Sequence, residues 1–204
     1  YKISTSSAVA CGSTINLTQT VTYTGGTSPT SLPIQLTVGS FGTTVLFSEN
    51  FDSVTAPALP AGWTTQQTGA SPPALWATAA TGADSAPNTA VTNGVTSVAS
   101  NSLISPAISL PAGPFPATLN FRHAWNFESA TSSFDGGILE ISTDGGLNYN
   151  NVTSPAVGAT FSAGGYNTTL SSNFSKPLGG QQAWGRVQST FVTTTLPLPA
   201  SLNG

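Results

Sequence analysis

The sequence predicts an all-β protein whose main part is an antiparallel β-sandwich. Three observations lead to this fold class. Apolar and polar residues alternate with period two over several segments, glycine and proline separate these segments (21 Gly and 15 Pro among 204 residues), and no segment shows the 3.6-residue period of a helix. Short alternating strands joined by turns are typical of sandwiches.

The clearest alternation lies in residues 118–146, which we interpret as two long strands of one sandwich. In the first strand five residues share one face, which is expected to be core: Leu119, Phe121, His123, Trp125 and Phe127. In the second strand Leu139 and Ile141 flank Glu140. Arg122 and Glu140 then lie on non-core faces, where a cross-strand ion pair is the expected role.

Residues 1–40 are predicted to form a separate N-terminal β segment. Strands are expected over residues 2–6, 15–23 and 31–38, with a turn at 25–29. Three strands with one apolar face are too few to close a sandwich. The segment is therefore interpreted either as part of an immunoglobulin-like domain or as a set of strands that docks on something else.

Residues 41–204 are predicted to form the second domain, the main sandwich. Residues 66–101 are rich in small and polar residues and are expected to form a surface excursion with short strands, anchored by Trp76. Pro106 places the strand-like residues 103–110 at a sheet edge or a bulge. After the central pair the chain continues through residues 148–153 and 166–170 to a strand at 189–196 that is rich in β-branched residues.

The composition excludes two classes of function. Only 5% of the residues are charged, with a formal net charge of −3, whereas an average domain has about 25% charged residues. A nucleic-acid-binding protein needs a basic stripe, which a total of four Lys and Arg residues does not provide. No apolar run approaches the ~20 residues of a membrane-spanning helix.

The single cysteine, Cys11, cannot form an internal disulfide and is expected to be buried or to pair between molecules.

Four Asn-x-Ser/Thr sequons provide candidate glycosylation sites: Asn16, Asn151, Asn167 and Asn173. In a chain this rich in Asn and Thr several sequons arise by chance, yet these lie in predicted turns or on outer faces. Glycans would also supply the solubility that charged residues normally provide.

Several short motifs follow one another from residue 45 onward. The segments are FSENFD at 47–52 with LPAGW at 59–63, LISP at 103–106, residues 119–123, FDGGILEIS at 134–142, and GGYN at 164–167 with PLGGQQAW at 177–184. Together they resemble the secreted MAM-like or choice-of-anchor-type jelly-roll modules that accompany P-like domains and peptidases. The resemblance implies a jelly roll, an extracellular location and a module that is not itself catalytic.

Modules of this kind often hold a structural Ca²⁺. The resemblance places the candidate ligands at Glu49, Asp52 and Asp135, with backbone oxygens completing the coordination shell. The alternative is that Glu49 and Asp52 are solvated turn residues and that Asp135 only starts a turn before two glycines.

In this family the segment that corresponds to residues 196–200 is followed by further strands that complete the sandwich. The second domain is therefore expected to lack its last strands, and the N-terminal segment its first ones. Unpaired backbone groups and bare apolar side chains are costly, so a longer polypeptide or a strand from a neighbouring copy must fill the gap. A head-to-tail exchange that does not close produces a filament.

Two non-catalytic functions follow. The first is an extracellular structural subunit that assembles with copies of itself by β-strand addition into a fibril or surface appendage. The second is a carbohydrate- or cell-surface-binding accessory module of a larger secreted hydrolase or peptidase. Its candidate stacking platforms are Trp63, Trp76 and Trp184.

An enzyme is the third class, and it has little support. His123 is the only histidine, so neither a Ser-His-Asp triad nor a multi-histidine zinc site can form. We expect His123 to be a hydrogen-bonded core residue. A carboxylate pair such as Glu128 with Asp135 would be the remaining route to glycoside hydrolysis.

Overall fold

The computed structural model describes residues 4, 9–39, 42–69, 71–113, 116–128, 133–173 and 176–203. Over these residues the strands are antiparallel and no α-helix is present, which confirms the all-β prediction at this level. No helix in this part of the chain is long and apolar enough to cross a bilayer. The chain divides into two compact units, Tyr1–Val45 and Leu46–Gly204.

The first unit contains a hairpin of β1 (Thr14–Val21) and β2 (Thr30–Thr37). Its register runs from Thr14 opposite Thr37 to Val21 opposite Thr30. The strands predicted at 15–23 and 31–38 are thus confirmed to within two residues. The predicted strand at 2–6 lies, apart from Ser4, outside the described residues. Cys11 is exposed, so its predicted burial is wrong.

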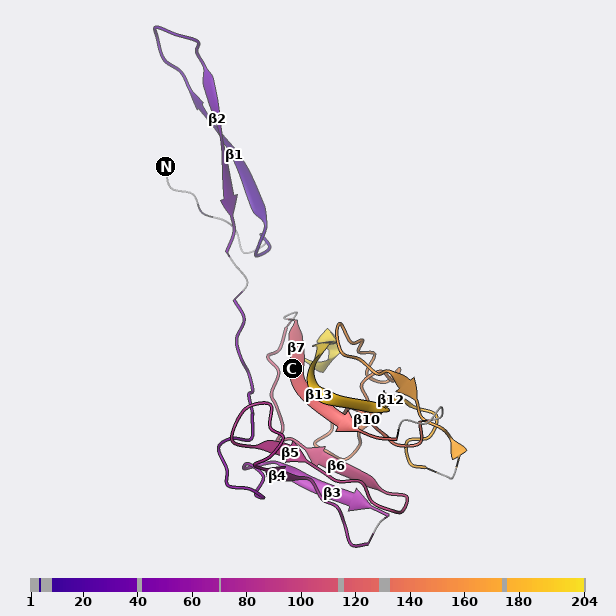
Figure 1. Ribbon diagram of the computed structural model, residues 1–204. Coiled ribbons are helices and arrows are strands. Elements are labelled where there is room, and N and C mark those ends of the chain that lie inside the picture. Colours follow the sequence, from indigo (N-terminus) through magenta and orange to yellow (C-terminus); the bar gives the residue numbers. More distant parts are fainter. Residues whose placement is uncertain are drawn as a thin grey trace. The chain divides into compact units, whose positions relative to one another are not determined.

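The second unit contains three longer ladders. β3 (Thr64–Thr68) pairs with β6 (Ser100–Ile104), β4 (Ala77–Ala79) with β5 (Thr89–Val91), and β7 (Ala117–Asn126) with β13 (Val187–Leu198). Figure 1 shows β3 to β6 gathered in one part of the unit and β7 running along β13.

Shorter ladders complete the described strands. β12 (Gln182–Gly185) lies between β8 (Gly136–Gly137) and β11 (Thr168–Thr169), and β9 (Glu140–Ile141) pairs with β10 (Asn150–Asn151). A 3-10 turn, η2 (Ala200–Leu202), follows β13.

The predicted central pair is only half right. β7 is a strand of ten residues with the expected alternation of side chains, but its partner is β13 and not the segment around residue 140. That segment contributes only the two-residue β9, which pairs with β10. The alternation of one strand does not specify which distant strand completes its ladder, because pairing is a tertiary choice.

The predicted ion pair between Arg122 and Glu140 is wrong for the same reason. The Arg122 guanidinium pairs with the Asp84 carboxylate, with Nη2 2.8 Å from Oδ1 and a second contact from Nε. This hydrogen bond holds the pKa of Asp84 below its usual value. Glu140 is exposed on β9, where partial loss of hydration raises the pKa of its carboxyl group.

The core of the second unit is small and lies beside β13. Leu196 is fully buried and packs with Val152, Val157 and Ala159. Partly buried residues surround these four: Leu119, Leu139, Ile141, Phe161, Tyr166, Leu198 and Leu202.

Candidate functional site

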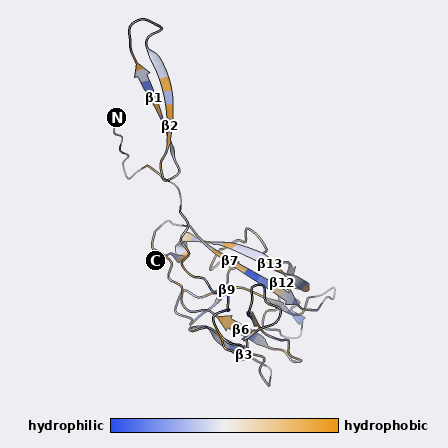
Figure 2. Cartoon of the chain, turned by 60° about the vertical axis from the view of Figure 1, so that its left-hand side comes forward, coloured by the Kyte–Doolittle hydropathy of each residue, from blue (hydrophilic) through white to orange (hydrophobic). Residues whose placement is uncertain are grey.

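The hairpin has one apolar and one polar face. Residues directly opposite each other point to the same side, so the register places three aliphatic residues of β1 beside three of β2. These residues are Ile15, Leu17, Val21, Leu32, Ile34 and Leu36. Hydrophobic and hydrophilic positions alternate along the hairpin strands in Figure 2.

None of these six side chains is buried. Leu32 is 50% exposed and Ile34 39%. A two-stranded hairpin has no third strand or second layer of its own to cover such a face, and is marginally stable alone. The apolar face therefore requires something packed against it.

The hydrogen bonds show which backbone groups of the hairpin point outward. The Val38 N–H donates to the Ser13 carbonyl at 2.9 Å, one step before the pair Thr14 and Thr37. Hydrogen-bonded and non-hydrogen-bonded pairs alternate in an antiparallel ladder. Four residues of β1 therefore direct their backbone N–H and C=O groups away from β2: Thr14, Asn16, Thr18 and Thr20.

The two edges of the hairpin are not equivalent. The same alternation directs the backbone of Ser31, Pro33 and Gln35 away from β1. Pro33 has no N–H, so the outer edge of β2 lacks a donor at its middle, which is how natural proteins block an edge strand. The outer edge of β1 has no such interruption, and no other described strand pairs with it.

The second open edge among the described strands is the side of β7 that faces away from β13. Ala163 exchanges hydrogen bonds with Thr195 of β13 on the side away from β7, so Thr195 and its opposite residue Asn120 form a non-hydrogen-bonded pair. By alternation, four residues of β7 point their backbone groups away from β13: Thr118, Asn120, Arg122 and Ala124. No hydrogen bond to these groups is found within the described part of the chain.

Arg122 does not obstruct this edge. Its Nη1 donates to the Thr193 hydroxyl at 3.1 Å and its Nη2 approaches the Phe191 carbonyl at 3.4 Å. Both acceptors lie on β13, so the guanidinium extends over the paired side of β7.

The inner face of β7 carries an aromatic cluster with Trp184 at its centre. The Trp184 ring lies 4.6 Å from His123 and 5.7 Å from Phe121, and Trp125 lies 4.7 Å from His123, all between ring centroids. Trp184 is 5% exposed, whereas Phe121, His123 and Trp125 are only partly buried. The face is thus incompletely covered next to the open edge.

His123 is a hydrogen-bonded histidine of this cluster, as the sequence predicts. Its Nε2 lies 2.9 Å from the Thr194 hydroxyl, which itself donates to the Gly164 carbonyl at 2.7 Å. The hydroxyl proton is committed to Gly164, so Nε2–H is the donor to Thr194. Partial burial lowers the pKa of His123 to about 4 because the charged form loses hydration.

The structure does not bring the three predicted calcium ligands, Glu49, Asp52 and Asp135, together in one group. Among the described residues no group of three or more His, Cys, Asp or Glu side chains could hold a metal ion. Asp52 accepts hydrogen bonds from the Asn88 N–H at 2.8 Å and the Ser85 hydroxyl at 3.0 Å, and Glu49 accepts from the Phe51 N–H at 2.7 Å. These hydrogen bonds organise a loop.

Asp135 lies in a different environment. Its carboxylate pairs with the Lys176 ammonium at 2.7 Å, and its N–H donates to Glu128 Oε1 at 2.8 Å. Glu128 also accepts from the N–H of Phe134. Glu128 and Asp135 are therefore engaged in holding this turn together.

The four sequons differ in whether the acceptor amide is available. The Asn151 amide donates to Gln181 at 3.1 Å and its oxygen accepts from Tyr166, and the Asn167 amide bonds the Gly185 backbone in both directions. Asn16 and Asn173 are exposed, and their side chains form no hydrogen bond with the described residues. Asn16 and Asn173 are the more accessible acceptors.

The three tryptophans proposed as stacking platforms are packed against the protein. Trp63 contacts Phe51 with ring centroids 4.9 Å apart, and Trp76 donates from its indole to the Asn101 carbonyl at 3.3 Å. Trp184, at the centre of the aromatic cluster, donates from its indole N–H to the Gly164 carbonyl at 2.8 Å. A sugar ring would need a tryptophan face turned to solvent, and Trp184 offers none.

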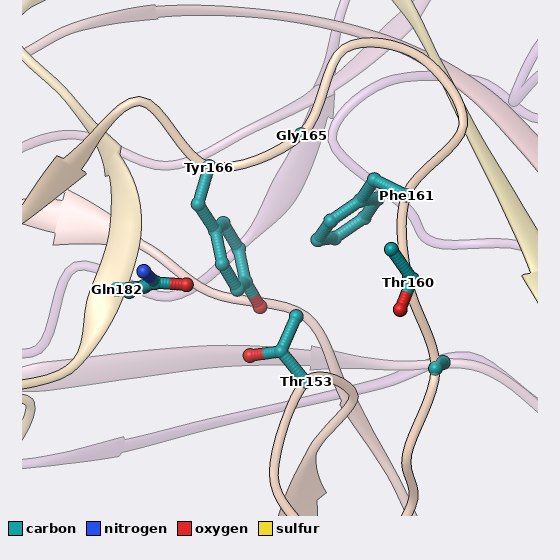
Figure 3. A pocket seen from close by; sticks show the side chains of 7 residues that line it. Thr153, Thr160, Phe161, Gly165, Tyr166 and Gln182 are labelled. Carbon is teal, nitrogen blue, oxygen red and sulfur yellow. The ribbon is translucent and has the colours of Figure 1, made fainter.

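An open pocket of about 350 Å³ lies between the segment after β10 and β12. Figure 3 shows the Phe161 and Tyr166 rings beside the side chains of Thr153, Thr160 and Gln182. The Tyr166 hydroxyl bonds Leu139 and Asn151, and burial raises the pKa of Tyr166 to about 12. Gln182 lies in the PLGGQQAW motif, whereas Phe161 belongs to no motif and had no signal in the sequence.

No family model matches the chain, and no match was found among curated proteins or among solved structures. The function is therefore inferred from the geometry described above.

Proposed function

We propose that this chain is a non-catalytic, extracellular structural subunit that assembles head-to-tail with copies of itself by β-strand addition into a fibril or surface appendage. In this proposal the second unit is a jelly-roll sandwich of the MAM-like or choice-of-anchor type. The antiparallel ladders of the second unit agree with that architecture.

The observation that carries the proposal is the uncovered apolar face of the β1–β2 hairpin. Six aliphatic side chains lie on one face and none is buried. Large exposed apolar patches mark interaction sites. The hairpin carries no charged residue on either strand, so it can dock without desolvating a charge.

The low overall charge supports assembly. A formal net charge of −3 on 204 residues gives weak repulsion between copies. His123, the only histidine, is committed to the aromatic cluster rather than to a reactive site.

The test is the state of the purified chain. We expect electron microscopy to show regular filaments, and light scattering after size exclusion to show species far above 20.6 kDa. A monomer that stays monomeric as its concentration rises, with the hairpin folded, would overturn the proposal.

A carbohydrate-binding role is the second candidate, and the pocket at Phe161 and Tyr166 is the observation that favours it. An aromatic ring beside hydroxyl and amide groups is chemistry suited to sugars. Binding of soluble oligosaccharides that Gln182→Ala weakens, by a chain that does not assemble, would favour this candidate over the first.

A further inference from the structure

We propose that the open edge of β1 in one copy pairs antiparallel with the open edge of β7 in the next copy. This inference rests on the proposed function and adds to it the identity of both strands and their direction. It follows from four properties of the two edges.

The first property is that each edge offers an uninterrupted row of backbone groups. β1 presents those of Thr14, Asn16, Thr18 and Thr20, and β7 those of Thr118, Asn120, Arg122 and Ala124. The alternative edge of the hairpin, on β2, lacks a donor at Pro33. β1 is therefore the strand of the hairpin suited to strand addition.

The second property is that the two strands have matching faces. On both edges the outward-bonding residues carry their side chains on the more polar face, and the residues between them carry the apolar ones. In an antiparallel ladder outward-bonding residues lie directly opposite each other, with side chains on the same side. Antiparallel pairing therefore joins polar face to polar face and apolar face to apolar face.

Parallel pairing would fail this requirement. In a parallel ladder a residue that bonds across the edge lies opposite one that does not. Polar residues such as Asn16 would then lie beside apolar residues such as Phe121, and the polar face of one strand would continue into the apolar face of the other. The direction of pairing follows from the alternation alone.

The third property is that the apolar face of each strand pair has exposed or partly buried residues next to its open edge. Leu32, Ile34 and Leu36 of the hairpin are exposed, and Phe121 and Trp125 beside the open edge of β7 are only partly buried. Placing the hairpin beside β7 extends the aromatic face with six aliphatic residues, and a continuous apolar surface forms on one side.

The fourth property is that no charge opposes the contact. β1 and β2 contain no charged residue, and Arg122 on β7 is neutralised by Asp84 and extends over β13. A second copy of this chain is thus compatible with the edge, whereas a charged peptide would find no charged residue on the hairpin with which to pair.

The test uses proline to remove one outward donor at a time. Thr20→Pro blocks the β1 edge, and Asn120→Pro blocks the β7 edge; neither N–H takes part in the ladder within the chain. The matched control is Ser31→Pro, because Ser31 lies directly opposite Thr20 and points to the β2 edge that Pro33 already interrupts. All three leave every sequon intact.

We expect Thr20→Pro and Asn120→Pro each to raise the concentration needed for filament formation by about tenfold or more, the change expected for a loss of about 1.4 kcal/mol at each junction. Ser31→Pro should assemble like the unaltered chain. A mixture of the two blocked variants retains one intact β1 edge and one intact β7 edge, so it should form dimers and nothing longer.

The outcomes separate this inference from the proposed function. If the unaltered chain does not assemble, the proposed function fails. If it assembles and Thr20→Pro and Asn120→Pro assemble equally well, or Ser31→Pro is as defective as Thr20→Pro, the assignment of edges is wrong while assembly stands. Amide exchange that protects Asn16, Thr18 and Asn120 in a 20.6 kDa monomer would show pairing within one chain and overturn the role of a second copy.

Discussion

The β1–β2 hairpin and the β7–β13 ladder are both antiparallel pairs with one apolar face, yet among the described residues only the second has a core packed against that face. Leu119 of β7 and Leu196 of β13 lie opposite each other and contact the core around Val152, and Leu196 is fully buried. Leu32 of β2 occupies a comparable position in its hairpin and is half exposed. The same sequence pattern therefore has different energetic consequences in the two units.

The difference shows that alternation creates a surface that needs a partner but does not supply one. The ladder β7–β13 obtains its cover from the segments around Val152 and Trp184. Among the described residues of its own unit, the hairpin has no comparable segment. Four experiments test this comparison.

The largest expected difference is between two leucine truncations. Leu196→Ala should lower the free energy of unfolding of the second unit by about 2–5 kcal/mol, because it leaves a cavity in a packed core. Leu32→Ala should change the stability of the monomer by less than about 0.5 kcal/mol, as for an exposed position. Denaturant unfolding below the concentration of assembly measures both. An equal loss at Leu32 would mean that its face is already covered within one chain.

The next effect concerns a loop of the second unit that is held by hydrogen bonds. Asn88 is 4% exposed, and its amide donates to the carbonyls of Phe51 and Val54 at 3.0 and 2.6 Å. Asn88→Ala leaves both carbonyls without this donor and should cost about 1–3 kcal/mol. Asn173→Ala, at an exposed side chain without such bonds, is the control and should be neutral within about 0.5 kcal/mol. Thermal unfolding distinguishes the two.

The titration of His123 is expected to make the stability of the second unit depend on pH. Its pKa is about 4 in the folded chain, below its ordinary value of 6.5, so the unfolded chain binds the proton first as the pH falls. The contribution of neutral His123 to the free energy of unfolding is therefore fully present above pH 6.5, and it decreases by about 1 kcal/mol per pH unit towards pH 4.

His123→Gln keeps a hydrogen-bond donor for Thr194 and removes the titration. Unfolding measured at several pH values should then show a flatter profile between pH 6.5 and 4 than in the unaltered chain. A profile of unchanged slope would mean that other groups cause the pH dependence, and that His123 is not held neutral by the aromatic cluster.

The smallest effect on stability is expected from glycosylation. In a host that glycosylates secreted proteins, Asn16→Gln and Asn173→Gln should each remove the mass of one glycan, because these amides are exposed. Asn151→Gln and Asn167→Gln should leave the mass unchanged, since both amides are bound within the fold. Intact-mass spectrometry decides, and a glycan on Asn151 would require the bonds to Gln181 and Tyr166 to open.

Part of the fold could be predicted because it is local. The alternation around Phe121 identified β7 and its inner face, and the turn after Tyr23 separated the two strands of the hairpin. The partner of β7 and the partner of Arg122 could not be predicted, because residues about 70 positions away along the chain, and Asp84 at 38 positions, provide them. Whether Glu49, Asp52 and Asp135 meet was a tertiary question of the same kind, and the fold pairs the Asp135 carboxylate with Lys176.

The sequence by itself determined the period of the strands, the near absence of charge and the proline that interrupts the outer edge of β2. These three features depend only on the order of neighbouring residues and on the chemistry of single side chains, and both are the same in any fold. Only the tertiary structure decided which strand edges are open. An edge is open when no other strand pairs with it, and this depends on segments that are distant along the chain. Ala163 closes the outer side of β13 and nothing in the described chain closes that of β7.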